Sequence, residues 1–335
     1  MTTALSPLKR GLTWAECVLK FAGRYLLLSF QPSHWKPTTS PEVAVENTSV
    51  CNARCIFCAN GIMERPRIAM KEEVFRKTVD EAILLGSQVI DFSVMIGDPL
   101  LDRKLLERAR YIKAFPQVRE MGMTTTLQWL HLFDLDEFFQ CGFTWVAVST
   151  TLSGRERYRD FFGVDKYDQM LVNLQALLNE NNRRNKPIKI LITIKPTPEP
   201  RRDILNHPDF KLVLSLTSQN LRKMVKHEAF FVFDWGGAVR LPSYLRLHPL
   251  WPRKRRPCGR LLRHLMVYSN GKVGACNCVD FEASSDLILG NVEQDSLVDM
   301  WHGARLKQIQ SDWRSGKSIP RVCQLCRMYR AGPAN

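Results

Sequence analysis

Two alternating patterns of apolar residues run through residues 41–245. Short β-rich runs at 41–50, 88–97, 120–127, 143–150, 188–195 and 229–237 are separated by segments with apolar residues at helical spacing, at 71–86, 105–115, 135–142 and 166–181. Strands that alternate with helices over short connections are typical of a parallel sheet with helices on its outside. The sequence therefore predicts an α/β fold in which six strand–helix repeats form a partial, open (β/α)6 barrel.

The pattern changes on both sides of this series. After residue 245 it gives way to Pro, Arg and Cys, which predicts a boundary and a small α+β module at 246–335. Residues 1–40 form an N-terminal extension, in which charged residues recur every four positions from Glu16 to Arg24. A membrane span needs about 20 apolar residues without such charges. We expect an amphipathic helix at 15–30 that docks on the domain, with peripheral contact to a membrane surface as the alternative.

The composition indicates the class of protein, its partners and its compartment. The chain has 335 residues, of which 45% are apolar and 24% are charged, as in a globular protein. Its net charge of +15 is concentrated late, at 182–186, 198–203 and 252–260, and indicates either a solvated basic face or an anionic partner. The first residues lack an apolar secretion leader, so we expect a cytoplasmic protein whose clustered cysteines bind metal rather than form disulfides.

Three of the ten cysteines lie within eight residues, in the segment CNARCIFC (51–58). The segment follows the first predicted strand, at the carboxyl edge where active sites of parallel α/β folds gather. Three thiolates can hold three irons of a 4Fe–4S cluster and leave the fourth iron without a protein ligand. A zinc ion that borrows a distant fourth ligand is the alternative.

This segment resembles the Cys-x3-Cys-x2-Cys signature of the radical S-adenosylmethionine (SAM) enzymes, including the aromatic Phe57 before the last cysteine. The resemblance covers about residues 41–335. It implies a partial TIM-like barrel and a 4Fe–4S cluster on Cys51, Cys55 and Cys58, with SAM on the open iron. It also implies a 5′-deoxyadenosyl radical that abstracts a substrate hydrogen, and an external electron donor of the flavodoxin or ferredoxin kind.

Other positions are similar to the family's SAM-binding elements. IGDP (96–99) resembles the family's Gly-Gly-Glu-Pro stretch, so the resemblance places Gly97, Asp98 and Pro99 near the methionyl amine. Ile96 and Asp98 replace a glycine and a glutamate, and an ordinary strand-to-helix turn is the structural alternative. Ser149 stands where relatives contact the ribose. Lys195 ends the fifth strand; its role is left open, and we interpret it as a surface lysine.

A second group of cysteines follows residue 257. Cys258 precedes a hairpin predicted by Asn270-Gly271, Cys276 follows it, and Cys323 and Cys326 form a CxxC pair. Four sulfurs suit a closed metal site. The region resembles the SPASM and shortened twitch modules of radical SAM enzymes, which implies an auxiliary 4Fe–4S cluster on these four residues. Zinc is again the alternative.

Three cysteines remain. Cys278 is interpreted as a structural thiol, a substitute ligand or a hydrogen donor, and Cys17 and Cys141 as packed side chains. Cys141 is also named with Cys278 as a candidate hydrogen donor. His227, His264 and His302 are interpreted as ordinary polar residues.

A fully protein-ligated auxiliary cluster favours uptake of one electron from the substrate radical. The twitch enzymes that the chain resembles include dehydrogenases of aminocyclitols and sugars. We therefore predict two-electron oxidation of a hydroxyl-bearing small molecule or glycan, with an anionic group as an option. Radical epimerisation with a cysteine hydrogen donor and modification of a ribosomal peptide are alternatives. A nucleic-acid-binding cluster protein would leave the three-cysteine site unexplained.

Overall fold

The computed structural model describes residues 37–217, 221, 231–248, 250–251 and 253–330, together with positions 19, 22, 23 and 26. The helix predicted at 15–30 lies, apart from those four positions, outside the described residues, and so do Cys17 and His227. None of the helices in the described ranges is long and apolar enough to cross a membrane.

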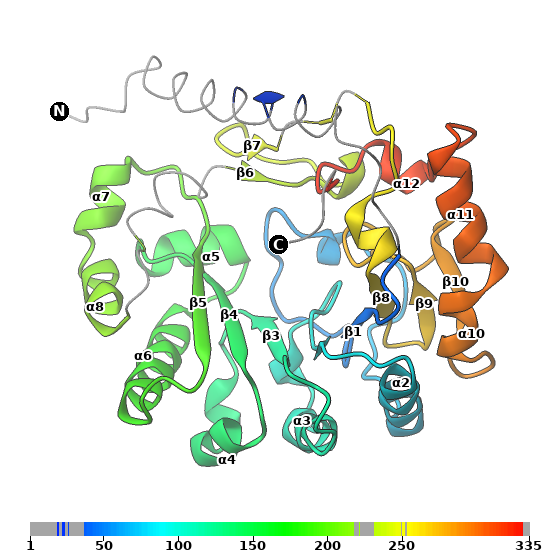
Figure 1. Ribbon diagram of the computed structural model, residues 1–335. Coiled ribbons are helices and arrows are strands. Elements are labelled where there is room, and N and C mark those ends of the chain that lie inside the picture. The colour runs from blue at the N-terminus through cyan, green and yellow to red at the C-terminus, as the bar shows by residue number, and fades with distance from the viewer. Residues whose placement is uncertain are drawn as a thin grey trace.

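A curved sheet of parallel strands forms the centre of the molecule (Figure 1). Its strands, in spatial order, are β8 (His264–Val267), β1 (Glu42–Val45), β2 (Ile90–Asp91), β3 (Gly122–Thr125), β4 (Trp145–Thr150) and β5 (Lys189–Ile194). Single parallel bridges join β2 to β3, at Val89–Glu120 and Phe92–Met123. The predicted α/β class and partial barrel are confirmed.

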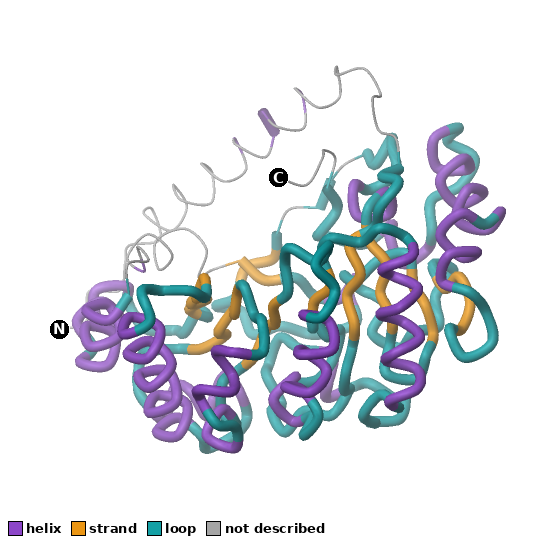
Figure 2. Tube along the Cα trace, turned by 60° about the horizontal axis from the view of Figure 1, so that its bottom comes forward, coloured by secondary structure: helices purple, strands orange, loops and turns teal. Residues whose placement is uncertain are grey.

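Helices cover the outer side of this sheet, as Figure 2 shows. They are α2 (Glu72–Leu84), α3 (Leu105–Lys113), α4 (Leu135–Gln140), α5 (Arg155–Phe162), α6 (Tyr167–Arg183), α7 (Arg201–Asn206) and α8 (Pro208–Leu216). The helix α2 shows why they form, since its apolar residues recur at helical spacing on the buried face and its first turn carries Glu72 and Glu73.

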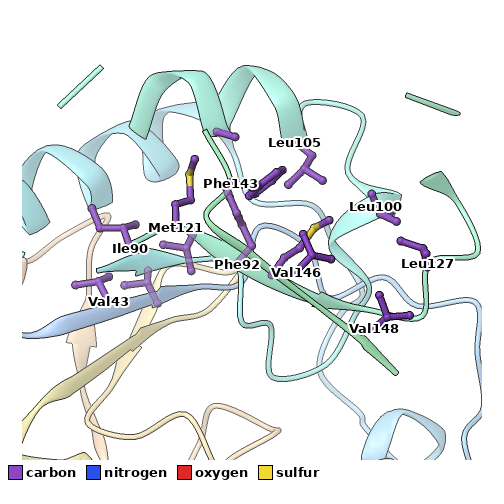
Figure 3. Packing of buried hydrophobic residues seen from close by; sticks show 14 of the residues in the cluster. Val43, Ile90, Phe92, Leu100, Leu105, Met121, Leu127, Phe143, Val146 and Val148 are labelled. Atoms are coloured by element: carbon purple, nitrogen blue, oxygen red, sulfur yellow. The ribbon is translucent and has the colours of Figure 1, made fainter. Parts of the chain in front are cut away.

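The main core lies between the sheet and these helices (Figure 3). Burial alternates along β4, where Val146 and Val148 are fully buried while Ala147 and Ser149 are half-buried. The alternation points one set of side chains to the helices and the other to the concave inner face, which we call the lumen. Each fully buried aliphatic side chain contributes about 1.5–3 kcal/mol.

The sixth barrel strand is not where the sequence predicted it. The run at 229–237 gives only the two-residue β6 (Phe231–Val232), which pairs with β7 (Arg246–Leu247) in a separate sheet. The sixth position is filled by β8 on the far side of β1, because Leu265 and Val267 extend the apolar layer of Val43 and Val45. Strand pairing is non-local, so apolar runs alone did not distinguish β6 from β8.

The C-terminal region continues the barrel's sheet through β9 (Lys272–Gly274) and β10 (Ile288–Asn291), which are antiparallel. Its helices are α10 (Leu297–His302), α11 (Ala304–Arg314) and α12 (Arg321–Gln324). Short 3₁₀ helices are η1 (Ala59–Gly61), η2 (Pro99–Leu101), η3 (Leu130–Leu132), η4 (Trp235–Gly237) and η5 (Gly259–Leu262).

The predicted hairpin joins β8 to β9, but its turn differs from the expected one. Of Asn270 and Gly271, only Gly271 has a positive φ, of 78°. Asn270 instead accepts a hydrogen bond from the Lys272 amide, so the turn is not the expected one with two left-handed residues.

Candidate metal centres

The first cysteine loop is held on the end of α5. The amides of Arg54 and Ile56 donate to the carbonyls of Phe162 and Phe161, at 2.8 and 3.0 Å. Gly163 follows α5 with a φ of 68°, and a Cβ there would lie 2.8 Å from the Arg54 carbonyl oxygen. A glycine at this position therefore permits the close approach of loop and helix.

Phe57 anchors the same loop from the other side. Its ring lies 5.3 Å from that of Phe161, and its carbonyl accepts a hydrogen bond of 2.9 Å from Trp235 Nε1. The Nζ of Lys195 lies 5.2 Å from the centre of the Phe57 ring. The lysine left without a role from sequence thus stands beside the cysteine loop.

The thiols of Cys51, Cys55 and Cys58 are half-buried and free of disulfides. Burial raises the pKa of all three thiols, that of Cys51 to about 12. The neighbouring thiols of Cys58 and Cys51 raise the pKa of Cys55 further. Cysteine thiols lose their protons when they bind a metal. Once deprotonated, neighbouring thiolates are the ligands that hold iron–sulfur clusters. Within the described ranges, no group of three His, Cys, Asp or Glu side chains is arranged to hold a single metal ion.

The predicted SAM-binding turn lies next to this loop. Gly97 has a φ of 132°, and a Cβ there would lie 2.3 Å from the Thr48 carbonyl oxygen, so only glycine fits. The buried Asp98 carboxylate accepts four hydrogen bonds, from the Leu100 amide, the Thr125 hydroxyl, and the amide and hydroxyl of Thr126. Its acceptor sites are filled. The contact with an amino group predicted for Asp98 would therefore displace one of these donors.

A buried polar network behind the loop escaped the sequence analysis. Gln128 is fully buried, accepts from Asn52 Nδ2 at 2.6 Å and donates to the Tyr158 hydroxyl at 2.7 Å. Trp129 Nε1 donates to Asn52 Oδ1 at 3.0 Å. These residues lie in three separate segments, and no local pattern marks them as partners.

Polar side chains lie on the lumen side of the sheet. Ser149 on β4 pairs in register with Thr193 on β5, and both are half-buried. Asp91, half-buried on β2, pairs with Ala44 and accepts a hydrogen bond of 2.8 Å from the Ser93 amide. Burial raises the pKa of Asp91 to about 6; the Ser93 hydrogen bonds and Arg260 lower it, and Glu42 raises it. The sequence analysis missed this carboxylate, since one acidic residue in a short strand gives no signal.

The second cysteine group converges on one pocket, which all five of its cysteines line. Cys258 comes from the residue before η5, Cys276 and Cys278 follow β9, and Cys323 and Cys326 stand at α12. All but Cys276 are at most 9% exposed, and the apolar walls include Leu261, Leu287, Trp313 and Tyr329. A buried, all-thiol donor set fits an iron–sulfur cluster.

The two predicted hydrogen donors lie in different parts of the fold. Cys141 is fully buried, its thiol donates to the Phe138 carbonyl at 3.0 Å, and burial raises its pKa to about 11. It precedes the start of β4, at the edge opposite Ser149. Cys278 lines the second pocket, where a hydrogen bond with the Cys276 thiol lowers its pKa.

Two family models match the chain. The model described as the radical SAM superfamily matches residues 45–207, and the SPASM model, an iron–sulfur cluster-binding domain, matches residues 258–327. The second description favours iron–sulfur over the zinc alternative.

Curated relatives are remote. GTP 3′,8-cyclase of Chlorobaculum tepidum is 28% identical over 136 residues, which are 41% of this chain and 40% of that protein. Probable GTP 3′,8-cyclase of Metallosphaera sedula is 24% identical over 289 residues, which are 82% of this chain and 87% of that protein. The match with the first thus spans less than half of either protein.

Solved structures share the fold. BtrN in complex with AdoMet and 2-DOIA has a TM-score of 0.58 at 16% identity and covers 89% of this chain and 97% of its own. Streptococcus suis SuiB bound to precursor peptide SuiA has a TM-score of 0.57 at 13% identity, with 97% and 77% covered. Native anSMEcpe with bound AdoMet has a TM-score of 0.55 at 13% identity, with 86% and 89% covered.

Proposed function

Because this chain belongs to the radical SAM superfamily and takes SAM and 4Fe–4S clusters as its cofactors, we propose that it oxidises a hydroxyl-bearing carbohydrate or aminocyclitol-like substrate by two electrons. The convergence of five cysteines on the second pocket carries the proposal. A cluster there has a thiolate for every iron, so it has no open position for substrate and is suited to electron transfer.

The cofactors divide between the two cysteine groups. When bound, SAM and the first cluster supply a radical that removes a hydrogen atom from substrate carbon, and the second cluster takes up one electron. We assign the first cluster to Cys51, Cys55 and Cys58. The second is assigned to Cys258, Cys276, Cys323 and Cys326, with Cys278 as an additional thiol in the same pocket.

The SAM-binding residues are proposed from their place beside the first loop. The Asp98 amide donates a hydrogen bond of 3.0 Å to the carbonyl of Val50, the residue before Cys51, so the Gly97–Pro99 turn lies close to the start of that loop. The absence of a side chain at Gly97 lets this turn pack directly against the Thr48 carbonyl, three residues before Cys51. Ser149 faces the lumen and is proposed to contact the ribose, while Phe57 shapes the loop.

Oxidation of a secondary alcohol to a ketone also releases a proton from the hydroxyl group. We assign its acceptance to Asp91, which faces the lumen and has a pKa raised by burial to about 6. A base with a pKa near the working pH is an efficient proton acceptor. The Arg260 Nε is buried without a hydrogen-bond partner among the described residues. It is an available donor for a polar substrate near Asp91.

Cyclisation of GTP is a second candidate, because both curated relatives carry that name. Peptide modification is a third, since SuiB was solved with a precursor peptide. Epimerisation is a further alternative, with Cys141 before β4 or Cys278 in the second pocket as the hydrogen donor.

The test uses anaerobically reconstituted full-length enzyme with SAM and reduced flavodoxin or ferredoxin. Hexoses, amino sugars, aminocyclitols, GTP and a peptide library are supplied separately, and 5′-deoxyadenosine is measured above the substrate-free background. We expect stimulation by a hydroxyl compound and a product lighter by two hydrogen atoms. Stimulation by GTP or peptide alone would overturn the substrate class. A product with the same connectivity as the substrate, which carries one deuterium when it is formed in D2O, would indicate epimerisation.

A further inference from the structure

The basic run at residues 253–256 does not form a uniform charged surface. Arg253 and Arg255 are exposed, whereas Lys254 between them is only 6% exposed. Lysine is almost never this buried without a partner for its charge. The reason for its burial therefore lies in what its ammonium group contacts.

The Lys254 Nζ donates to three backbone carbonyls of the CxxC segment. They belong to Cys323, Gln324 and Cys326, at 2.5, 2.8 and 2.7 Å. The ammonium group has three donors, and all are used. Two of the acceptors belong to the last residues of α12, where helix carbonyls lack intrahelical partners and favour a cation.

The backbone of the same residue is also fixed. Its carbonyl accepts a hydrogen bond of 2.6 Å from Trp313 Nε1, and the Tyr329 ring centre lies 5.8 Å from Nζ. Trp313 and Tyr329 both line the cysteine pocket. Lys254 therefore connects one wall of this pocket to the loop that carries two of its thiols.

No carboxylate forms an ion pair with Lys254 in the part of the chain that the structure describes. Besides the carbonyl dipoles, the groups that favour its charge are Cys326, Cys323 and Cys258 in their thiolate form, whereas burial and the charge of Arg327 oppose it. A buried charge is costly unless it is compensated. The thiolates of an occupied cluster provide that compensation, and the cation in turn favours the more negative, reduced form of the cluster.

We propose that Lys254 is a positioning residue of the auxiliary cluster: it holds the Cys323–Cys326 loop in its ligating shape and raises the cluster's reduction potential. The inference rests on the assignment of that cluster within the proposed function, but not on the substrate or on the oxidation itself.

The test compares Lys254→Met and Lys254→Arg with the matched surface controls Arg253→Met and Arg255→Met. All are made in the full-length Cys51→Ala/Cys55→Ala/Cys58→Ala background, so that only the auxiliary cluster gives a signal. Iron retention under a chelator and an EPR-monitored redox titration are the readouts. For Lys254→Met we expect at least tenfold faster loss of iron to the chelator. We also expect a lower reduction potential: the equilibrium constant for reduction should fall about tenfold, which is about 59 mV for one electron.

Lys254→Arg keeps the charge but cannot direct three donors to converging carbonyls as an ammonium does. We expect it to restore most of the potential while iron loss remains faster than in the parent. Lys254→Met in the otherwise unchanged chain checks folding, because SAM cleavage at the first site should persist. If this single variant cleaves SAM but holds no auxiliary iron, the positioning role is supported. The effect on the reduction potential is then measured with Lys254→Arg.

If Lys254→Met retains iron as well as Arg253→Met and Arg255→Met do, and has the same reduction potential, the proposal is overturned. A background protein that binds no auxiliary iron even with Lys254 intact would instead contradict the cluster assignment on which the proposal rests.

Discussion

The two cysteine groups are built in opposite ways. The first three cysteines lie within eight consecutive residues, are half-buried, and stand on a loop fastened to α5 by backbone hydrogen bonds. The second group draws five cysteines from three separated segments into one apolar pocket, and four of them are at most 9% exposed. The first group depends on local spacing, and the second depends on the tertiary fold.

This difference matches the chemistry assigned to each group. Three closely spaced, partly accessible thiols leave one iron of a cubane for a ligand that is not protein. Five thiols around one pocket leave none. We therefore expect the first centre to bind SAM and the second to exchange electrons only, and the following predictions test that division.

The largest expected effect comes from removing one group at a time. The Cys51→Ala/Cys55→Ala/Cys58→Ala variant should fall from about eight irons per chain to about four and lose all SAM cleavage. Cys323→Ala/Cys326→Ala should also fall to about four irons, but should still cleave SAM without forming product. Iron assay and chromatography of 5′-deoxyadenosine give both results. Cleavage by the triple variant would refute the division.

A smaller loss is expected from a substitution in the lumen. Asp91→Asn removes the proposed proton acceptor, and we expect kcat to fall by about 100-fold. The wild-type rate should decline below about pH 6, because protonated Asp91 cannot accept a proton, and this decline should disappear in the variant. The measurement is the pH profile of product formation with the substrate found in the panel.

Stability provides the control for Asp91. A carboxyl group whose pKa is raised on folding contributes stability that is present below its unfolded pKa and is lost as pH rises through about 6. The neutral Asn variant should therefore unfold at pH 7 no more readily than the wild type. A variant that unfolds more readily would point to a structural role for Asp91 instead.

The anchoring of the first loop can be weakened without touching a thiol. Gly163→Ala introduces a Cβ at a φ of 68° and 2.8 Å from the Arg54 carbonyl oxygen, so it should cost about 2 kcal/mol. We expect less iron in the first centre and an unchanged second centre, measured by EPR in the reconstituted protein. Gly61→Ala is the matched control, since a Cβ there meets nothing within 4 Å. Equal effects of both substitutions would argue against the anchoring role.

The smallest effect is expected within the second pocket. Cys278→Ala should retain about eight irons, because the other four thiols still complete the auxiliary site. In Cys276→Ala, Cys278 should replace the missing ligand, which would keep the iron content and shift the EPR signal. Loss of about four irons from Cys278→Ala alone would instead make Cys278 the native ligand.

Sequence patterns predicted what depends on neighbouring residues. The thiol spacing at 51–58 and the helical periodicity of α2 and α6 are local, and the structure reproduces these helices within a few residues. The place of β8 beside β1 is set by side chains more than 200 residues apart in the sequence, so local apolar runs favoured β6 instead. Tertiary contacts override local propensity in such cases.

The same limit applies to single polar residues. Lys254 stands between two arginines of the same charge, and nothing in that run marks it as the buried one. The residues around Asp91 in the sequence are ordinary, and its pKa is raised chiefly by burial on the inner face of the sheet. Asp98 was predicted to lie near SAM, but its saturation by Thr125 and Thr126 depends on the neighbouring strand β3.

The most direct test of the division adds SAM to each half-loaded protein and follows the EPR spectrum of the reduced cluster. In Cys323→Ala/Cys326→Ala, where only the first cluster remains, SAM should change the spectrum, because it binds the iron without a protein ligand. In Cys51→Ala/Cys55→Ala/Cys58→Ala, where only the auxiliary cluster remains, the spectrum should stay the same. A spectrum that responds to SAM in the second protein, or fails to respond in the first, would contradict the account.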